Sequence, residues 1–321
     1  MINIYVITQE LDESIILEGL DGWGTLKYIP CTTEKDIIEN CKDADVLISL
    51  YEPITSSVMD ALKRLKFISL ASIGYDTVDV DYASRKGIYV ANIPNYCVEE
   101  VTDHTVALIL TLSRKLFIYN RLVQQGKWLY EGAGRDIFRL STRTLGLLGF
   151  GNIARKVALR MKSFGCRIIA YDPYVSEEVA GEIGVELVRM EKLLEESHII
   201  SLHLPLNKET EKLLNRRTFS LMSQKPILVN CARGGVIDEK ALVEALDSGQ
   251  VSAAGLDVLE SEPPDLENCE LLHRDNVILT PHAAFYSSNS MEEAHVRAMD
   301  HVKYFLQGHL DKIPLVNRLD Q

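Results

Sequence analysis

The fold of this chain is decided by the stretch Leu147-Leu148-Gly149-Phe150-Gly151-Asn152-Ile153-Ala154. It matches the pattern G-x-G-x-x-A between a predicted strand at residues 145–148 and a predicted helix at residues 153–164. The first glycine permits a tight turn, the second lets backbone amides approach a pyrophosphate, and the small alanine lets helix and strand pack closely. The candidate cofactor-binding residues here are Gly149, Phe150, Gly151, Asn152 and Ile153.

An acidic residue follows where a ribose would bind. Asp172 comes about 20 residues after Gly151, at the end of a predicted strand at residues 167–171. A carboxylate there can bind ribose hydroxyls and would repel a 2′-phosphate, so NAD is predicted in preference to NADP. The other interpretation of Asp172 is a solvated loop acid, and a nearby cation could alter the preference. Arg155 and Arg160 lie on the intervening helix.

Strands and helices alternate along most of the chain. Such alternation predicts parallel sheets, and 321 residues suit two domains of common size. The predicted fold class is therefore α/β, with two doubly wound parallel-sheet domains. Predicted strands cover residues 2–8, 46–50, 67–71, 88–91, 145–148, 167–171, 199–204, 227–231, 253–258 and 277–279. Predicted helices cover residues 98–119, 153–164, 239–246 and 291–306, and one more ends at residue 193.

Composition excludes several classes of function. The formal net charge of −12 disfavours nucleic acid and anionic membrane surfaces, and no basic patch offsets it. No apolar run approaches the roughly 20 residues of a membrane helix, and the N-terminus lacks the pattern of a signal peptide. Six cysteines without a CxxC pair predict reduced thiols and no metal site. We therefore expect a cytoplasmic protein.

Three segments in the last third of the chain each place a reactive side chain in a constrained backbone. They are VNCARGG at 229–235, GLDVLESEP at 255–263 and TPHAA at 280–284. Together with residues 203–210 and the loop SIGYD at 72–76, they resemble the D-2-hydroxyacid dehydrogenase family over nearly the whole chain. The nearest branch is that of C-terminal-binding-protein-like and phosphoglycerate-dehydrogenase-like members.

The resemblance implies a domain organisation and an activity. It implies a discontinuous, flavodoxin-like substrate domain at residues 1–100 and 290–321, and a Rossmann NAD-binding domain at residues 101–289, with a cleft between them. The implied reaction transfers a hydride between nicotinamide and C2 of a small 2-hydroxy or 2-oxo acid.

Three residues suit that chemistry on physical grounds as well. The oxygen on C2 of a 2-oxo acid must receive a proton as the carbon receives hydride, and His282 is a suitable donor. Glu262 would stabilise its imidazolium form, and Arg233 offers planar donors to a carboxylate and a keto oxygen. Taken singly, the three residues could equally be a structural histidine, a loop acid and a surface cation.

The resemblance implies further roles. It places six residues along the cofactor: Leu204, Pro205, Thr210, Cys231, Ala232 and Asp257, the last facing the nicotinamide carboxamide. It places the substrate carboxylate on backbone amides of Ile73 and Gly74, and it makes Phe285 a wall of the substrate pocket where corepressor members carry a tryptophan.

Two questions stay open at this level. The alternative function is an NADH-sensing, dimeric binding protein of corepressor type with little turnover, although the three catalytic candidates favour an enzyme. The substrate is also open among glyoxylate, hydroxypyruvate, pyruvate and longer 2-oxo acids. A glycine-bearing loop with aromatics at about residues 124–141 is interpreted either as a surface loop or as an arm of a homodimer formed through the NAD-binding domain.

Overall fold

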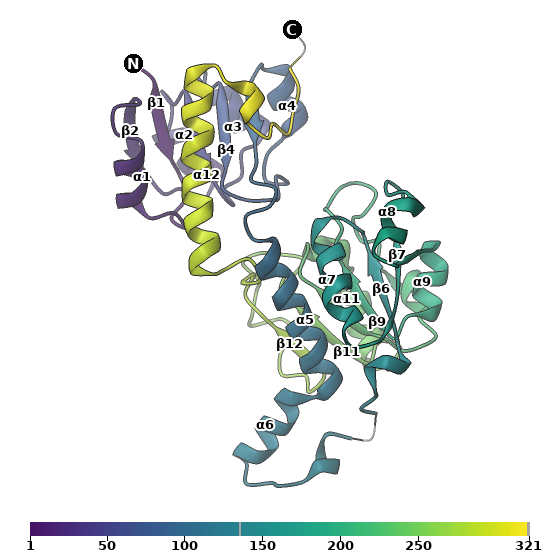
Figure 1. Cartoon of the computed structure of the whole chain (residues 1–321). Coiled ribbons are helices and arrows are strands. Elements are labelled where there is room, and N and C mark those ends of the chain that lie inside the picture. The colour runs from purple at the N-terminus through teal and green to yellow at the C-terminus, as the bar shows by residue number, and fades with distance from the viewer. Residues whose placement is uncertain (135, 320–321) are drawn as a thin grey trace. The chain divides into compact units, whose positions relative to one another are not determined.

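The structure, a computed structural model, describes residues 1–134 and 136–319. The chain divides into two compact units (Figure 1). The terminal unit comprises Met1–Tyr96 and Tyr286–Gln321, and the central unit comprises Cys97–Phe285. The chain thus changes units a few residues before the expected boundaries at 100/101 and 289/290. Both units are α/β with parallel sheets, which confirms the predicted fold class.

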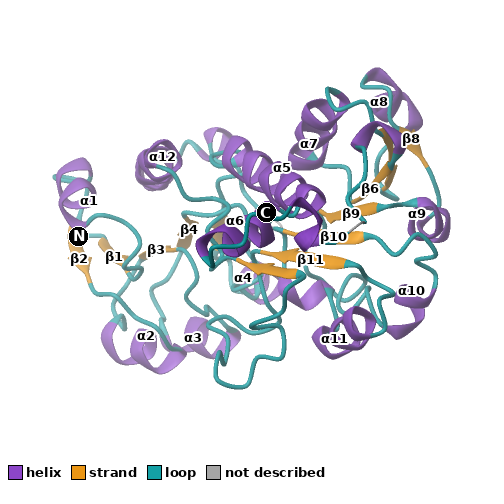
Figure 2. Cartoon of the chain, turned by 90° about the horizontal axis from the view of Figure 1, so that it is seen from below, coloured by secondary structure: helices purple, strands orange, loops and turns teal. Residues whose placement is uncertain are grey.

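The terminal unit contains five parallel strands in the order β2-β1-β3-β4-β5, the flavodoxin-like order. Helices α1 and α12 cover one face of this sheet, and α2 and α3 cover the other (Figure 2). Every residue of β3 and β4 is buried because both faces are covered. The elements are β1 Asn3–Val6, α1 Glu13–Gly19, β2 Thr25–Tyr28, α2 Glu34–Asn40, β3 Val46–Ser49, α3 Ser56–Ala61, β4 Phe67–Leu70, α4 Val80–Arg85, β5 Tyr89–Ala91 and α12 Ser288–Gln307.

The central unit contains seven parallel strands in the order β12-β11-β10-β9-β6-β7-β8. Its first three strands lie side by side as β8-β7-β6, and the chain then crosses to β9, as in a Rossmann sheet. Helices α5 and α7 pack on one face, and α9, α10 and α11 pack on the other (Figure 2). The elements are α5 Val98–Arg114, α6 Leu116–Gln124, β6 Thr144–Leu148, α7 Asn152–Lys162, β7 Arg167–Tyr171, α8 Glu177–Glu182, β8 Glu186–Leu187, α9 Met190–Glu196, β9 Ile199–Leu202, α10 Arg216–Ser220, β10 Ile227–Asn230, α11 Glu239–Asp247, β11 Ala253–Leu256 and β12 Val277–Leu279.

Some predicted elements were wrong in detail. The helix predicted at residues 98–119 is interrupted at Lys115, whose backbone is left-handed with φ of 52°. The Lys115 ammonium donates to the Ala133 carbonyl and pairs with Asp136. Contacts with residues about 20 positions later in the sequence therefore stabilise the interruption of the helix. The helix predicted to run through residue 193 is instead α8, the short strand β8, and α9.

All strands of the central unit are parallel, so their carboxyl ends share one edge of the sheet. The loops at this edge carry the candidate residues of the unit, as expected for open α/β sheets. Among the described residues, no helix is long and apolar enough to cross a membrane, and no cluster of His, Cys, Asp and Glu could hold a metal ion.

Candidate active site

The glycine loop between β6 and α7 requires glycine at its first position. Gly149 has φ of 89°, and a Cβ atom there would lie 2.5 Å from the carbonyl oxygen of His203. The Gly149 amide donates to the Tyr171 carbonyl at 2.9 Å. The loop is therefore held tightly between the ends of β7 and β9.

Space remains beside the second glycine. A Cβ atom on Gly151 would meet no heavy atom within 4 Å among the described residues, and Gly151 is the N-cap of α7, an 11-residue helix. Amides of Asn152 and Ile153 lie in its first turn, where backbone N–H groups attract anions. The Phe150 side chain is fully buried, so only its backbone can face a cofactor. The loop thus fits a dinucleotide pyrophosphate.

Asp172 lies at the end of β7, next to this loop. Its Oδ2 accepts from the Phe150 amide at 2.8 Å, and its Oδ1 accepts from the Tyr174 amide at 2.9 Å. A carboxylate oxygen can accept more than one hydrogen bond, so ribose hydroxyls can still bind. Arg155 donates to the Phe150 carbonyl and lies over the Phe150 ring. No described contact links Arg155 to Asp172, so Arg155 does not form an ion pair with this carboxylate.

His282 and Glu262 form a close pair. The Nδ1 atom of His282 lies 2.6 Å from Oε2 of Glu262, with both side chains partly exposed. Glu262 Oε1 also accepts from the Leu259 amide at 3.3 Å. A carboxylate accepts hydrogen bonds, so Nδ1 carries the proton between the two groups. This hydrogen bond orients the imidazole of His282.

Arg233 stands on a braced loop after β10. Asn230 is fully buried; its side-chain nitrogen donates to the Arg233 carbonyl and its oxygen accepts from the Ala232 amide. A Cβ atom on Gly234 would lie 1.8 Å from the Leu259 carbonyl oxygen, so this loop touches the one that leads to Glu262. The structure therefore brings the segments of Arg233 and Glu262 together. Sequence reasoning missed Asn230, although a polar residue ending an apolar strand is a weak signal.

Most of the residues placed along the cofactor by resemblance lie on loops at the same sheet edge. The Thr210 hydroxyl donates to the Pro205 carbonyl at 2.5 Å and so braces the loop after β9, with Leu204 partly buried beside it. Cys231 and Ala232 are partly buried after β10. Burial raises the pKa of the Cys231 thiol to about 12, so it stays protonated. Asp257 is buried after β11, where it binds backbone amides of Ala283 and Ala284.

The substrate candidates are divided between the units. Ile73 and Gly74 follow β4 in the terminal unit. The Ile73 carbonyl accepts from the Asn92 side chain, and the Gly74 carbonyl accepts from the Ser72 hydroxyl. The backbone amides of Ile73 and Gly74 donate to no other described residue. Phe285 ends the central unit, with its ring edge-on to that of His282 at 6.1 Å between centroids.

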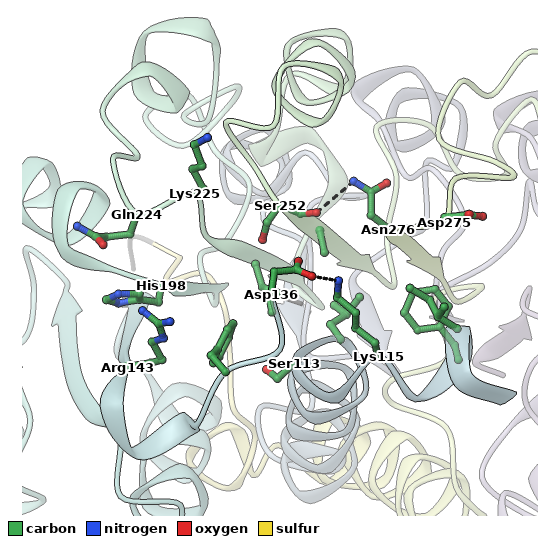
Figure 3. A pocket seen from close by; sticks show the side chains of 16 residues that line it. Ser113, Lys115, Asp136, Arg143, His198, Gln224, Lys225, Ser252, Asp275 and Asn276 are labelled. Carbon is green, nitrogen blue, oxygen red and sulfur yellow. Dashed lines mark hydrogen bonds and ion pairs between the residues drawn. The ribbon is translucent and has the colours of Figure 1, made fainter. Parts of the chain in front are cut away.

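A cavity of about 320 Å³ in the central unit is separate from these residues. It lies at the opposite edge of the sheet, where β10, β11 and β12 begin (Figure 3). Arg143 and His198 lie side by side in it, and Lys115 and Asp136, which form an ion pair, also line it. None of the candidate catalytic or cofactor residues lines this cavity.

Comparison with known proteins identifies the family. Residues 106–284 match the model of the D-isomer specific 2-hydroxyacid dehydrogenase NAD-binding domain. The chain is 39% identical over 284 residues to a glyoxylate reductase of Korarchaeum cryptofilum, covering 87% of this chain and 84% of that protein. It is 38% identical over 310 residues to a D-3-phosphoglycerate dehydrogenase of Methanocaldococcus jannaschii, covering 95% of this chain but 58% of that protein.

A solved structure agrees over the full length. The crystal structure of D-lactate dehydrogenase from Aquifex aeolicus, complexed with NAD and lactic acid, has a TM-score of 0.91 and 32% sequence identity, covering 99% of this chain and 100% of that one. The NAD prediction is confirmed by the matched NAD-binding domain and this neighbour. The chain belongs to the D-isomer specific 2-hydroxyacid dehydrogenase family and is an NAD-dependent oxidoreductase acting on 2-hydroxy acids.

Proposed function

We propose that this chain reduces a small 2-oxo acid of the size of glyoxylate to the 2-hydroxy acid, with His282 and Glu262 as the proton donor pair. The observation that carries the proposal is the 2.6 Å contact of His282 Nδ1 with Glu262 Oε2 at the edge where the glycine loop lies. Bound NADH supplies the hydride that C2 receives. The protein must then supply one proton and fix the substrate.

His282 delivers the proton from its Nε2 atom. In the imidazolium form both ring nitrogens carry hydrogen, and Nδ1 donates to Glu262 while Nε2 serves the oxygen on C2. The imidazole becomes neutral as that oxygen becomes a hydroxyl. In the reverse reaction, the oxidation of a 2-hydroxy acid, the Nε2 atom accepts the proton of the substrate hydroxyl. The negative charge of Glu262 stabilises the charged state in either direction.

Arg233 fixes the substrate through its planar, permanently charged guanidinium, whose donors suit a carboxylate and the adjacent keto oxygen. The amides of Ile73 and Gly74 are the other proposed donors to the substrate carboxylate. Phe285 offers an apolar wall beside His282, as its edge-on ring contact allows. The proposed cofactor contacts are those of the glycine loop, Asp172 and the loops after β9, β10 and β11.

Glyoxylate is favoured by the relatives. The glyoxylate reductases of Korarchaeum cryptofilum and Pyrococcus furiosus match this chain at 39% and 37% identity over most of both lengths. The phosphoglycerate dehydrogenase of Methanocaldococcus jannaschii is longer, and this chain spans 58% of it. These relatives are named as enzymes, which favours catalysis over the corepressor alternative.

The test is NADH oxidation against glyoxylate, hydroxypyruvate, pyruvate, phenylpyruvate and phosphohydroxypyruvate. We expect the highest kcat/KM with glyoxylate or hydroxypyruvate. A preference for phosphohydroxypyruvate would replace the proposed substrate by a phosphorylated one. Negligible rates throughout, with NADH binding retained, would contradict the proposal and favour the nucleotide-sensing binding protein.

We also propose a cytoplasmic homodimer formed through the central unit. Helix α6 projects beyond the sheet of this unit (Figure 1), and the segment after it exposes Trp128 and Tyr130 at 87% and 83%. Exposed aromatics of this kind favour a protein partner. The six cysteines are free thiols, which agrees with a reducing compartment. The negative charge disfavours nucleic acid and membrane partners. Sedimentation should give a dimer, and Trp128→Ser should weaken it; a monomeric wild-type chain would contradict the proposal.

A further inference from the structure

One buried carboxylate holds the segment that carries His282. Asp257 is 2% exposed, and its Oδ1 accepts from the Thr280 hydroxyl at 2.5 Å and from the Ala283 amide at 2.9 Å. Its Oδ2 accepts from the Ala284 amide at 2.9 Å. The His282 amide donates to the Asp257 carbonyl oxygen at 2.7 Å. The backbone at His282 and just after it is therefore fixed to Asp257, and the Thr280 side chain is fixed to Asp257 just before it.

These contacts hold an unfavourable backbone conformation. His282 has φ of 50°, in the left-handed region that residues other than glycine seldom adopt. Such a conformation persists only where surrounding contacts hold it. The hydrogen bonds to Asp257 are contacts of this kind, so loss of them would allow the imidazole to move.

His104 extends this network to helix α5. Its Nε2 atom lies 3.1 Å from the Thr280 hydroxyl oxygen and 3.7 Å from Oδ1 of Asp257, and its side chain is a quarter exposed. A threonine hydroxyl has one hydrogen to donate. Because that hydrogen goes to the Asp257 carboxylate, the hydroxyl oxygen accepts from His104, and Nε2 of His104 carries the proton. The hydrogen bonds thus run from His104 to Thr280 to Asp257.

We infer that His104 is a positioning residue for the reaction, an inference that rests on the proposed role of His282 as proton donor. His104 orients the Thr280 hydroxyl toward Asp257, and Asp257 keeps the backbone of His282 in place. Without the His104 donor, the hydroxyl can rotate and its hydrogen bond to Asp257 weakens. A displacement of about 1 Å at a reacting group can reduce turnover about 100-fold.

The experiment compares His104→Leu with His104→Gln. Leucine fills similar space without a donor, whereas the glutamine amide can donate to Thr280. We expect kcat with glyoxylate to fall roughly ten- to hundredfold in His104→Leu, with the Kd for NADH nearly unchanged. His104→Gln should keep most of the wild-type kcat. His198→Leu is the matched control, because His198 lies at the opposite sheet edge and should leave kcat unchanged.

A second pair of variants tests the network through Thr280. Thr280→Val should lower kcat as His104→Leu does. Thr280→Ser, which keeps the hydroxyl, should have a kcat close to that of the wild type. Adding His104→Leu to Thr280→Val should produce no further loss, because His104 acts through that hydroxyl. Thermal unfolding of each variant shows whether it is folded at the assay temperature, and if His104→Leu fails to fold, the Thr280 pair decides.

Three results would overturn the inference: wild-type kcat in His104→Leu, equal losses in the Leu and Gln variants, or additive losses in the double variant. His282→Ala, measured alongside, separates this failure from that of the proposed function. If His282→Ala is inactive while His104→Leu is unimpaired, only the positioning role is wrong. If His282→Ala retains turnover, the proposed function itself is wrong.

Discussion

His282 and Glu262 meet at 2.6 Å although they follow different strands of the central sheet, β12 and β11. The two strands pair in parallel, so their carboxyl ends lie at one edge. The Leu259 amide donates to the other oxygen of Glu262, Oε1, and this hydrogen bond directs Oε2 toward the imidazole. Backbone topology thus places the His282 imidazole and the Glu262 carboxylate together.

Glu262→Gln should lower kcat by about 100-fold while NADH binding is retained. The amide can still accept from His282 Nδ1 but lacks the negative charge that stabilises imidazolium, and general acid catalysis of this kind contributes about 100-fold or more. Steady-state kinetics with glyoxylate and NADH titration check both parts. Glu260→Gln is the control, because Glu260 lies on the same loop as Glu262 but pairs with Lys212 on another loop. Equal kcat in the two variants would contradict the assigned role.

Asp172→Ser should reduce the preference for NADH over NADPH. The carboxylate repels a 2′-phosphate, and serine removes that charge. Both cofactors should bind more weakly, because Asp172 also accepts from the Phe150 and Tyr174 amides. The informative quantity is therefore the ratio of kcat/KM for the two cofactors. An unchanged ratio, equal to that of the control Glu177→Ser, would show that another group sets the preference.

Much of the fold followed from local patterns. Strands such as β10, all four of whose residues are buried, appear in the sequence as apolar runs, and the glycine loop has a distinctive spacing. The break at Lys115 could not be predicted, because no glycine or proline marks it and its contacts are with residues 133 and 136. The strands β2 and β8 were missed because they lie partly exposed at sheet edges, and β8 has only two residues.

The site was predictable only in part. Spacing and chemistry singled out Gly149, Gly151 and Asp172. The pairing of His282 with Glu262 depended on family resemblance, since a separation of 20 positions in the sequence gives no distance. Asn230 and His104 were missed for a physical reason. A polar side chain that braces a loop is indistinguishable in sequence from one that is solvated.

Stability should fall in acid because of His301 on α12. This residue is 4% exposed, and burial, helped by Arg297, lowers its pKa from 6.5 to about 4. Between those values the unfolded chain binds the proton and the folded chain does not, so the free energy of unfolding decreases as pH falls. The expected slope is up to about 1.4 kcal/mol per pH unit for this group.

Urea unfolding at several pH values from 6.5 to 4 measures that slope. His301→Leu should have a smaller slope than the wild type, whereas replacement of the exposed His309 by glutamine should leave it unchanged. If His301→Leu keeps the wild-type slope, other groups account for the acid sensitivity.

The most direct test of proton donation by His282 is the His282→Ala variant, assayed with NADH and glyoxylate. Turnover is followed by the loss of nicotinamide absorbance, and NADH binding is measured separately by fluorescence titration. Turnover should fall by about 100-fold or more, with the Kd for NADH close to that of the wild type. Wild-type turnover by the His282→Ala variant would contradict the role of His282 as proton donor.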